Sequence, residues 1–208
     1  RCPMKNLTVA VMIGMLLMVG AMRFLTAVQE ADPEPRVARA AQAGLPGVKL
    51  HPNYQAFAAD EPRGDDVYRA IADHGLVLLA HCGRDFAFPP DDDRAAPHRF
   101  ARVLDRHPSL RLVATHMGGY RMWDEVEQVL VGRDNVWLET SFSLGELESD
   151  RAADIIRRHG YKHVLFGTDW PWNRHDAELA RLDALPLPDS AKNLIRLSNA
   201  AKLLGFTF

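Results

Sequence analysis

Six polar residues each follow or lie within a short apolar, β-rich run, and their types are those of a catalytic site. Two imidazoles and a carboxylate are a ligand set that zinc, iron or manganese accepts. A metal ion with an open position lowers the pKa of bound water to about 7, and a nearby carboxylate can then take the proton. A second histidine can polarise a carbonyl group. The six residues are Lys49, His51, His81, His116, Ser141 and Asp169.

Each of these residues also has a plain structural interpretation. A single histidine beside a strand is more often a hydrogen-bonded core or loop residue than a metal ligand. Asp169 precedes Trp170 and Pro171, and it fits the first position of a turn. Lys49 fits an ordinary surface ion pair, and His51 fits a loop. The occurrence of three such residues at equivalent positions favours the metal site.

Other kinds of site are disfavoured by the same sequence. Ser141 lacks the Gly-x-Ser-x-Gly surroundings of a serine hydrolase. Cys2 and Cys82 form no Cys-x-x-Cys pair, and nothing marks Cys82 as an activated thiol. The HMGG sequence at 116–119 has too few glycines for a dinucleotide- or phosphate-binding loop.

A repeating strand-and-helix pattern positions the polar residues. Five apolar runs begin 29, 35, 25 and 27 residues apart, and a strand with its crossover helix takes ~30 residues. A sixth strand is predicted at 24–28, before a helix at 36–43. The pattern predicts an α/β fold of the (β/α)8 TIM-barrel type, with about six of its eight units, whose site lies at the carboxyl ends of the strands. The five runs are residues 47–51, 76–81, 111–116, 136–141 and 163–169.

Three more histidines, His74, His107 and His159, fall at the ends of predicted helices. The helix dipole favours positive charge at a helix carboxyl end, so a structural role is expected for all three.

The composition is that of a globular protein. The chain has 208 residues, of which 47% are hydrophobic and 25% charged, with a net charge of −2. This composition argues against a disordered chain, and the lack of a basic surplus argues against a nucleic-acid partner. A small-molecule substrate is the expected partner, and a homodimer is left open.

The amino-terminal residues 7–22 form a charge-free, almost wholly apolar run. It is shorter than the ~20 residues that a bilayer-spanning helix needs. We therefore expect residues 1–23 to be a buried element beside a barrel domain at 24–208, with a signal or anchor segment starting at Met4 as the alternative. The sparse cysteines favour the cytoplasm, and export or membrane anchoring would follow from that alternative.

The motifs together resemble the amidohydrolase-related metal-dependent hydrolases, in the branch that contains the aminocarboxymuconate semialdehyde decarboxylase type. The resemblance covers residues 24–206, and its strength lies in the order and spacing of the motifs rather than in any one of them. The motifs are GVKLHP at 47–52, AHCG at 80–83, THMGG at 115–119, ETS at 139–141, FGTDWP at 166–171 and SNAAKLLG at 198–205.

The resemblance implies a distorted TIM barrel with one divalent metal ion, for which zinc is the first choice and manganese or iron the alternatives. It implies that His81 is a metal ligand and that His116 is a second ligand or a catalytic group. Asp169 would bind the metal and transfer the proton. Some relatives carry a carboxylated lysine between two metals at the position of Lys49, but a single metal is expected here. The residues expected to contact the substrate are Lys49, His51, Ser141 and Trp170.

The family's first strand ends in His-x-His, which supplies two metal ligands, and no His-x-His occurs in this sequence. The first strands are therefore expected to be missing or replaced. The expected activity is hydrolysis of a small carboxylic, lactone or amide substrate by metal-activated water. The alternatives are non-oxidative decarboxylation of an aromatic or unsaturated acid, and a catalytically inactive, truncated barrel.

Overall fold

The computed structural model describes residues 33–206, and its centre is one sheet of five parallel strands. The strands lie side by side in the order of the sequence, so each is paired with the next. Because all five run in the same direction, their carboxyl ends share one edge, as in a TIM barrel. The strands are β1 (Gly47–Leu50), β2 (Val77–Ala80), β3 (Arg111–Ala114), β4 (Val136–Glu139) and β5 (Val164–Leu165).

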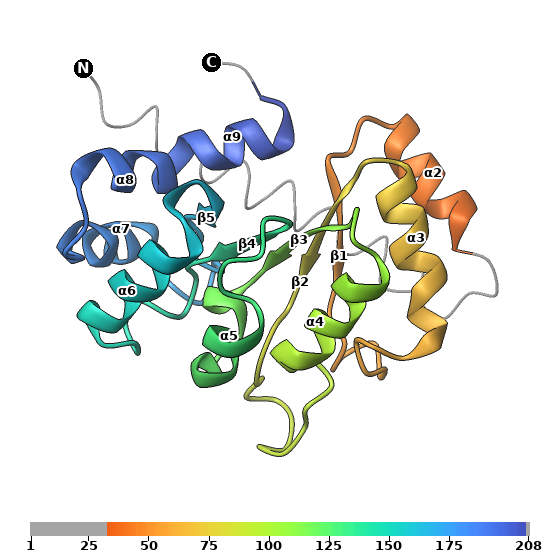
Figure 1. Cartoon of the computed structure of the whole chain (residues 1–208), viewed down its shortest axis with the longest axis horizontal. Helices are drawn as coiled ribbons and strands as arrows, with labels where there is room; N and C mark the ends of the chain where they lie inside the picture. Colours follow the sequence, from red (N-terminus) through yellow and green to blue (C-terminus); the bar gives the residue numbers. More distant parts are fainter. Residues whose placement is uncertain (1–32, 207–208) are drawn as a thin grey trace.

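Helices alternate with the strands and cover the outer face of the sheet, whereas the last described helix packs on the opposite face (Figure 1). The first six are α2 (Glu34–Gln42), α3 (Asp65–Asp73), α4 (Pro97–Arg106), α5 (Trp123–Val129), α6 (Ser149–His159) and α7 (His175–Ala184). Helix α8 (Asp189–Asn193), the π-helical η5 (Leu194–Ser198) and α9 (Asn199–Leu204) end the described chain. Short 3-10 turns occupy η2 (Pro62–Gly64), η3 (His116–Gly118) and η4 (Tyr161–His163).

The two faces of the sheet have different roles. Alternate strand residues such as Leu78, Leu112 and Leu138 pack against the helices in one large buried core. The opposite, inner face holds a smaller cluster formed by Val77, Leu79, Val113, Leu165 and Ala200. Because side chains alternate along a strand, Lys49 in register with Leu79 and Glu139 in register with Leu165 also belong to this inner face. The inner face therefore carries charged groups that the helix-covered face does not.

The predicted partial barrel is confirmed for the residues that the structure describes. Five of the six predicted strands are present, while the strand at 24–28 and the apolar run at 7–22 lie outside the described residues. The strands are shorter than the predicted runs, because each strand ends before the polar residue that closes the corresponding run. Strand β5 ends at Leu165, since the amide of Phe166 donates a hydrogen bond to the Ile195 carbonyl (3.0 Å) instead of continuing the ladder. Across residues 33–206, no helix has the length and apolar character needed to cross a bilayer.

The expected structural role of the three helix-end histidines rests on different interactions from the one predicted. His74 contacts Glu34 and His107 contacts Asp65, each through Nε2. His159 is buried, and burial lowers its pKa to about 4. It is therefore neutral at pH 7, and the helix-dipole explanation is wrong for this residue. Its Nδ1 accepts a hydrogen bond from the Gly132 amide, and its Nε2 donates one to the Val136 carbonyl.

Candidate metal and acid–base site

The carboxyl edge of the sheet brings three histidine rings together. His51 follows β1, His81 follows β2 and His116 follows β3. The rings of His51 and His81 are stacked, with centroids 4.1 Å apart and 6° between their planes. The ring of His116 meets that of His81 edge-on at 4.9 Å. The prediction that these strand-end residues share one mouth is thus fulfilled by the packing of neighbouring parallel strands.

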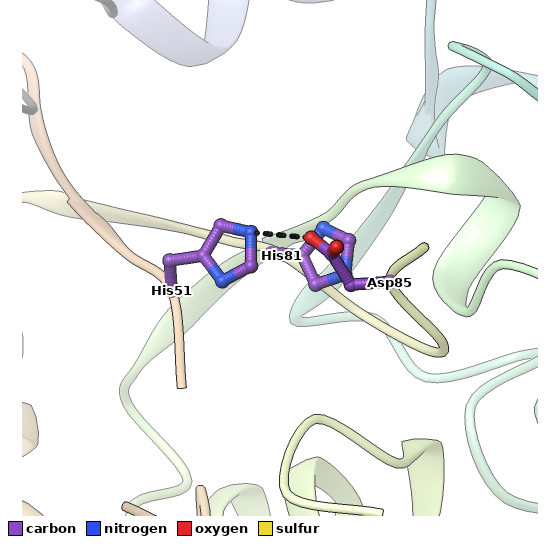
Figure 2. A group of neighbouring side chains, drawn as sticks. All are labelled: His51, His81 and Asp85. Carbon is purple, nitrogen blue, oxygen red and sulfur yellow. Dashed lines mark ion pairs between the residues drawn. The ribbon is translucent and has the colours of Figure 1, made fainter. Parts of the chain in front are cut away.

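Asp85 completes a group that we call the metal-ligand trio: His51, His81 and Asp85. The Oδ2 atom of Asp85 lies 3.3 Å from Nε2 of His51 and 4.0 Å from Nε2 of His81 (Figure 2). One ligand atom from each residue falls within 4.8 Å of the other two. Among residues 33–206, the trio is the one group of at least three histidine, cysteine or acidic side chains that could hold a metal ion.

The loop that carries Asp85 is held by a backbone bridge. Gly83 pairs with Tyr120, and the amide of Arg84 donates to the Tyr120 carbonyl at 3.0 Å. A Cβ atom on Gly83 would lie 2.1 Å from the Tyr120 amide nitrogen, so only glycine allows this approach. The bridge joins the loop after β2 to the loop after β3. It therefore fixes the path of the loop that carries Asp85.

All three rings are neutral at physiological pH. Burial, together with the positive charge of Lys49, lowers the pKa of His51 and of His116 to about 3. Burial and the neighbouring histidines hold the pKa of His81 well below its usual range. A metal ion binds the neutral imidazole, so these low pKa values leave each ring ready to coordinate without first losing a proton.

A chain of hydrogen bonds leads from His81 to a carboxyl group on β4. His81 Nδ1 lies 3.1 Å from His116 Nε2. His116 Nδ1 lies 3.0 Å from the hydroxyl oxygen of Ser141 and 3.2 Å from its carbonyl oxygen. The Ser141 hydroxyl donates to Oε2 of Glu139 at 2.7 Å, and the Ser141 amide donates to Oε1 at 2.9 Å. We call this series the Glu139 relay.

The carboxyl group of Glu139 lies against Gly167, in the segment that follows β5. A Cβ atom on Gly167 would lie 1.3 Å from Oε1 of Glu139, so the carboxyl group rests directly on the glycine backbone. The side chain of Thr140 accepts a hydrogen bond from the Gly167 amide at 3.2 Å, which keeps the two segments together. Burial raises the pKa of Glu139 to about 7, against the hydrogen bonds from Ser141 that lower it.

Asp169 and Lys49 face the same region without belonging to the trio. Asp169 remains accessible to solvent, yet its surroundings desolvate it enough to raise its pKa, with a further rise from Asp85 and an opposing effect of Lys49. Lys49 is half-buried on β1. Trp170, next to Asp169, is 53% exposed and stacks on the His175 ring at 5.6 Å. Lys49, Asp169 and Trp170 therefore lie closer to solvent than the buried rings of His81 and His116.

Backbone strain gathers at this edge of the sheet. His116, Met117, Phe142 and Asp169 all have φ between 52° and 59°, although none is glycine. Non-glycine residues rarely adopt this region, and such residues cluster at functional sites. At His116, the unusual φ occurs where the ring reaches both His81 and Ser141.

The trio fits a divalent metal in the type and number of its donors. Two neutral imidazoles and one carboxylate make three protein ligands, the usual number at a catalytic zinc site. His81 Nε2 is buried and has no hydrogen-bond partner among the described residues, so its position suits a metal ligand. The lone pairs of two parallel rings do not converge, so one of the stacked rings must turn for both to bind the same ion.

The structure places the predicted site residues at one edge but groups them differently. His81 and His116 are in contact, as predicted, whereas the metal-ligand trio contains His51, predicted to contact substrate, and Asp85, which the sequence analysis missed. Glu139 was also missed, and Ser141 is buried with its hydroxyl held between Glu139 and His116. Two features of the sequence could have indicated these residues. Asp85 is an acidic residue four positions after His81, and Glu139 is a charged residue at the end of an apolar strand.

A family model described as Amidohydrolase matches residues 18–206, and the chain belongs to this family. A search of curated proteins found no match.

Solved structures share the fold. An uncharacterised TIM-barrel protein from Bordetella bronchiseptica is 24% identical, with a TM-score of 0.71 over 82% of this chain and 61% of that one. A 5-carboxyvanillate decarboxylase from Sphingomonas paucimobilis is 19% identical, with a TM-score of 0.64 over 84% and 63%. A dihydroxybenzoic acid decarboxylase from Polaromonas, with bound manganese, is 16% identical, with a TM-score of 0.64 over 85% and 68%. The chain spans about three fifths of the length of the first two proteins.

Proposed function

We propose that the chain carries the site of a metal-dependent enzyme that hydrolyses a small carboxylic, lactone or amide substrate. The observation that supports this most strongly is the metal-ligand trio, with the buried and unpartnered Nε2 atom of His81 at its centre. Membership of the amidohydrolase family agrees with a divalent metal. The three ligands would be His51, His81 and Asp85.

The surrounding residues would divide the remaining work. A divalent metal bound to the trio would acidify a water molecule and polarise the substrate. Asp169 is suited to accept a proton, because its raised pKa lies closer to neutrality than that of an ordinary aspartate. Lys49 is suited to hold a substrate carboxylate, because its ammonium group lies at the same edge as the trio. The predictions that His116 is a second ligand or a catalytic group and that Asp169 binds the metal are separate from this set of three ligands and stay predictions.

Decarboxylation is the second candidate, and a specific observation favours it. The Sphingomonas and Polaromonas proteins, which share the fold, are decarboxylases of aromatic acids, and the Polaromonas structure contains manganese. The same groups would serve this reaction, with Lys49 and the metal holding the acid and Asp169 supplying the proton to the carbon that loses CO2. Manganese is then an alternative to zinc.

Metal titration of the 208-residue chain tests the proposal. After removal of metal with a chelator, we expect one Mn²⁺ or Zn²⁺ per chain by calorimetry. Lactones and amides would be followed by acid release, and dihydroxybenzoates by CO2 release, which separates the two candidate reactions. Turnover should require the metal, and Asp169→Asn should lower kcat by at least about 100-fold, the low end of general acid–base contributions.

The matched control is Asp176→Asn, since Asp176 is exposed on α7 and pairs with Arg174. This variant should keep full turnover. Failure of the wild-type chain to bind either ion, or turnover in the presence of excess chelator, would contradict the proposed function.

A further inference from the structure

The direction of each hydrogen bond in the Glu139 relay can be worked out from its chemistry. At pH 8, above its pKa of about 7, the Glu139 carboxyl group is mostly ionised and then only accepts hydrogen bonds. The amide and the hydroxyl of Ser141 both point at the Glu139 carboxylate, so the hydroxyl proton is committed to Oε2. The side of the Ser141 oxygen that faces His116 therefore presents a lone pair.

His116 must respond to this lone pair with a proton. Its Nδ1 atom faces two oxygen acceptors, the hydroxyl and the carbonyl of Ser141, at 3.0 and 3.2 Å. At pH 8, well above the ordinary pKa of a histidine, the ring is neutral and has a single ring proton. The proton is therefore on Nδ1, and Nε2 of His116 carries a lone pair.

The same reasoning carries over to His81. His116 Nε2 can only accept, so His81 Nδ1, 3.1 Å away, must donate. His81 is neutral as well at this pH, so donation from its Nδ1 atom leaves its Nε2 atom without a proton. That atom is buried, has no partner among the described residues, and lies 4.0 Å from the Asp85 carboxylate.

We infer that Glu139 is a positioning residue that acts through Ser141 and His116 to keep the Nε2 lone pair of His81 available to a metal ion. The inference rests on the proposed metal site. Partners beyond the ligands commonly fix the tautomer of a metal-binding histidine, and their loss typically weakens metal affinity about 10- to 100-fold. Here the controlling carboxylate lies three hydrogen bonds from the ligand atom, on a different strand.

Replacement of Glu139 by glutamine should reverse the relay without changing its shape. The backbone amide of Ser141 needs an oxygen acceptor, so the glutamine oxygen must stay at that position and its NH2 group must face the Ser141 hydroxyl. The hydroxyl proton would then be free to point at Nδ1 of His116, where it competes with the Ser141 carbonyl and shifts part of the ring population to the Nε2–H form. In that population, His81 would accept on Nδ1 and carry its proton on Nε2, where it blocks the metal.

Two measurements on the 208-residue chain test this inference. Long-range ¹⁵N–¹H correlation spectra of the metal-free protein at pH 8 report the ring nitrogen that carries the proton. We expect Nδ1–H on both His81 and His116 in the wild type, and a rise of the Nε2–H form of both rings in Glu139→Gln. Titration with Mn²⁺ should then show a 10- to 100-fold weaker affinity in Glu139→Gln than in the wild type.

Ser141→Ala provides the matched control. Without the hydroxyl, the Ser141 carbonyl alone still holds the proton on His116 Nδ1, so the tautomers should stay as in the wild type. The double variant Glu139→Gln/Ser141→Ala should therefore recover most of the affinity that Glu139→Gln loses, a rescue that a purely structural defect would not show.

Different results overturn the two proposals. An Nε2 proton on His81 in the wild type, or unchanged tautomers in a folded Glu139→Gln protein, would overturn the relay. Wild-type tautomers as expected, together with no Mn²⁺ binding, would overturn the proposed function instead. The wild-type spectrum decides the relay even if Glu139→Gln does not fold.

Discussion

The helix-end histidines and the strand-end histidines show how one residue type serves two purposes in the same repeating unit. His74, His107 and His159 lie at the ends of α3, α4 and α6. The first two contact a carboxylate, and both ring nitrogens of His159 form hydrogen bonds with backbone groups. Each of these rings therefore joins one element to another.

The strand-end histidines contact each other and leave nitrogens unsatisfied. His51 stacks on His81, which meets His116, and buried nitrogens of His51 and His81 have no hydrogen-bond partner among the described residues. Besides burial, His51 and His116 both lower the pKa of His81, and His116 lowers that of His51. Packing of this kind does not stabilise a fold by itself. Buried polar atoms without partners cost stability, so this edge of the sheet is the candidate place for a bound ligand.

The largest expected effect separates the two sets by metal binding. His81→Ala removes a member of the metal-ligand trio, and we expect Mn²⁺ affinity to fall by more than about 100-fold, beyond the range for partners outside the ligand shell. His107→Ala, at the end of α4, should leave the affinity unchanged. Calorimetric titration of both variants measures the difference. Equal affinities in the two variants would remove the functional distinction between the sets.

The next effect concerns acid stability and the helix-end His159. Its pKa is about 4 in the folded protein, against 6.5 for an ordinary histidine, a difference worth roughly 3 kcal/mol. As the pH falls below 6.5, the unfolded chain takes up the proton first, so this stability is lost between pH 6.5 and about 4. His159→Gln, which keeps a donor and an acceptor but does not titrate, should show a shallower loss in urea unfolding over this range.

Glu139 works in the opposite direction and provides the control. Its pKa is raised from 4.5 to about 7 in the folded protein, so its contribution to stability is lost as the pH rises through 7. Glu139→Gln should therefore gain stability relative to the wild type as the pH rises from 4.5 to 7.

Parallel pH profiles of the free energy of unfolding for His159→Gln and the wild type would contradict the assignment of His159 as a buried neutral group.

The position of the site could be predicted from the sequence, whereas its composition could not. The spacing of the apolar runs gives parallel neighbouring strands, and polar residues at their ends must then share an edge. Asp85 could not be assigned because its direction depends on the contact between Gly83 and Tyr120, which are far apart in sequence. Glu139 could not be assigned because its role requires knowing that Gly167, on the next unit, leaves space for its carboxyl group.

The smallest expected effect tests whether an exposed helix-end contact matters for stability. His74 Nε2 lies 2.8 Å from Oε1 of Glu34 and connects the end of α3 to α2, but both side chains are substantially exposed. Surface pairs of this kind contribute about 0–1 kcal/mol, because solvent screens the charges and two side chains lose freedom. His74→Ala should therefore lower the free energy of unfolding by less than about 1 kcal/mol in urea at pH 7. A loss above about 2 kcal/mol, the scale of a buried group left without its partner, would mean that the α2–α3 contact depends on this ring. The contribution of a helix-end histidine to stability would then not follow from its burial alone.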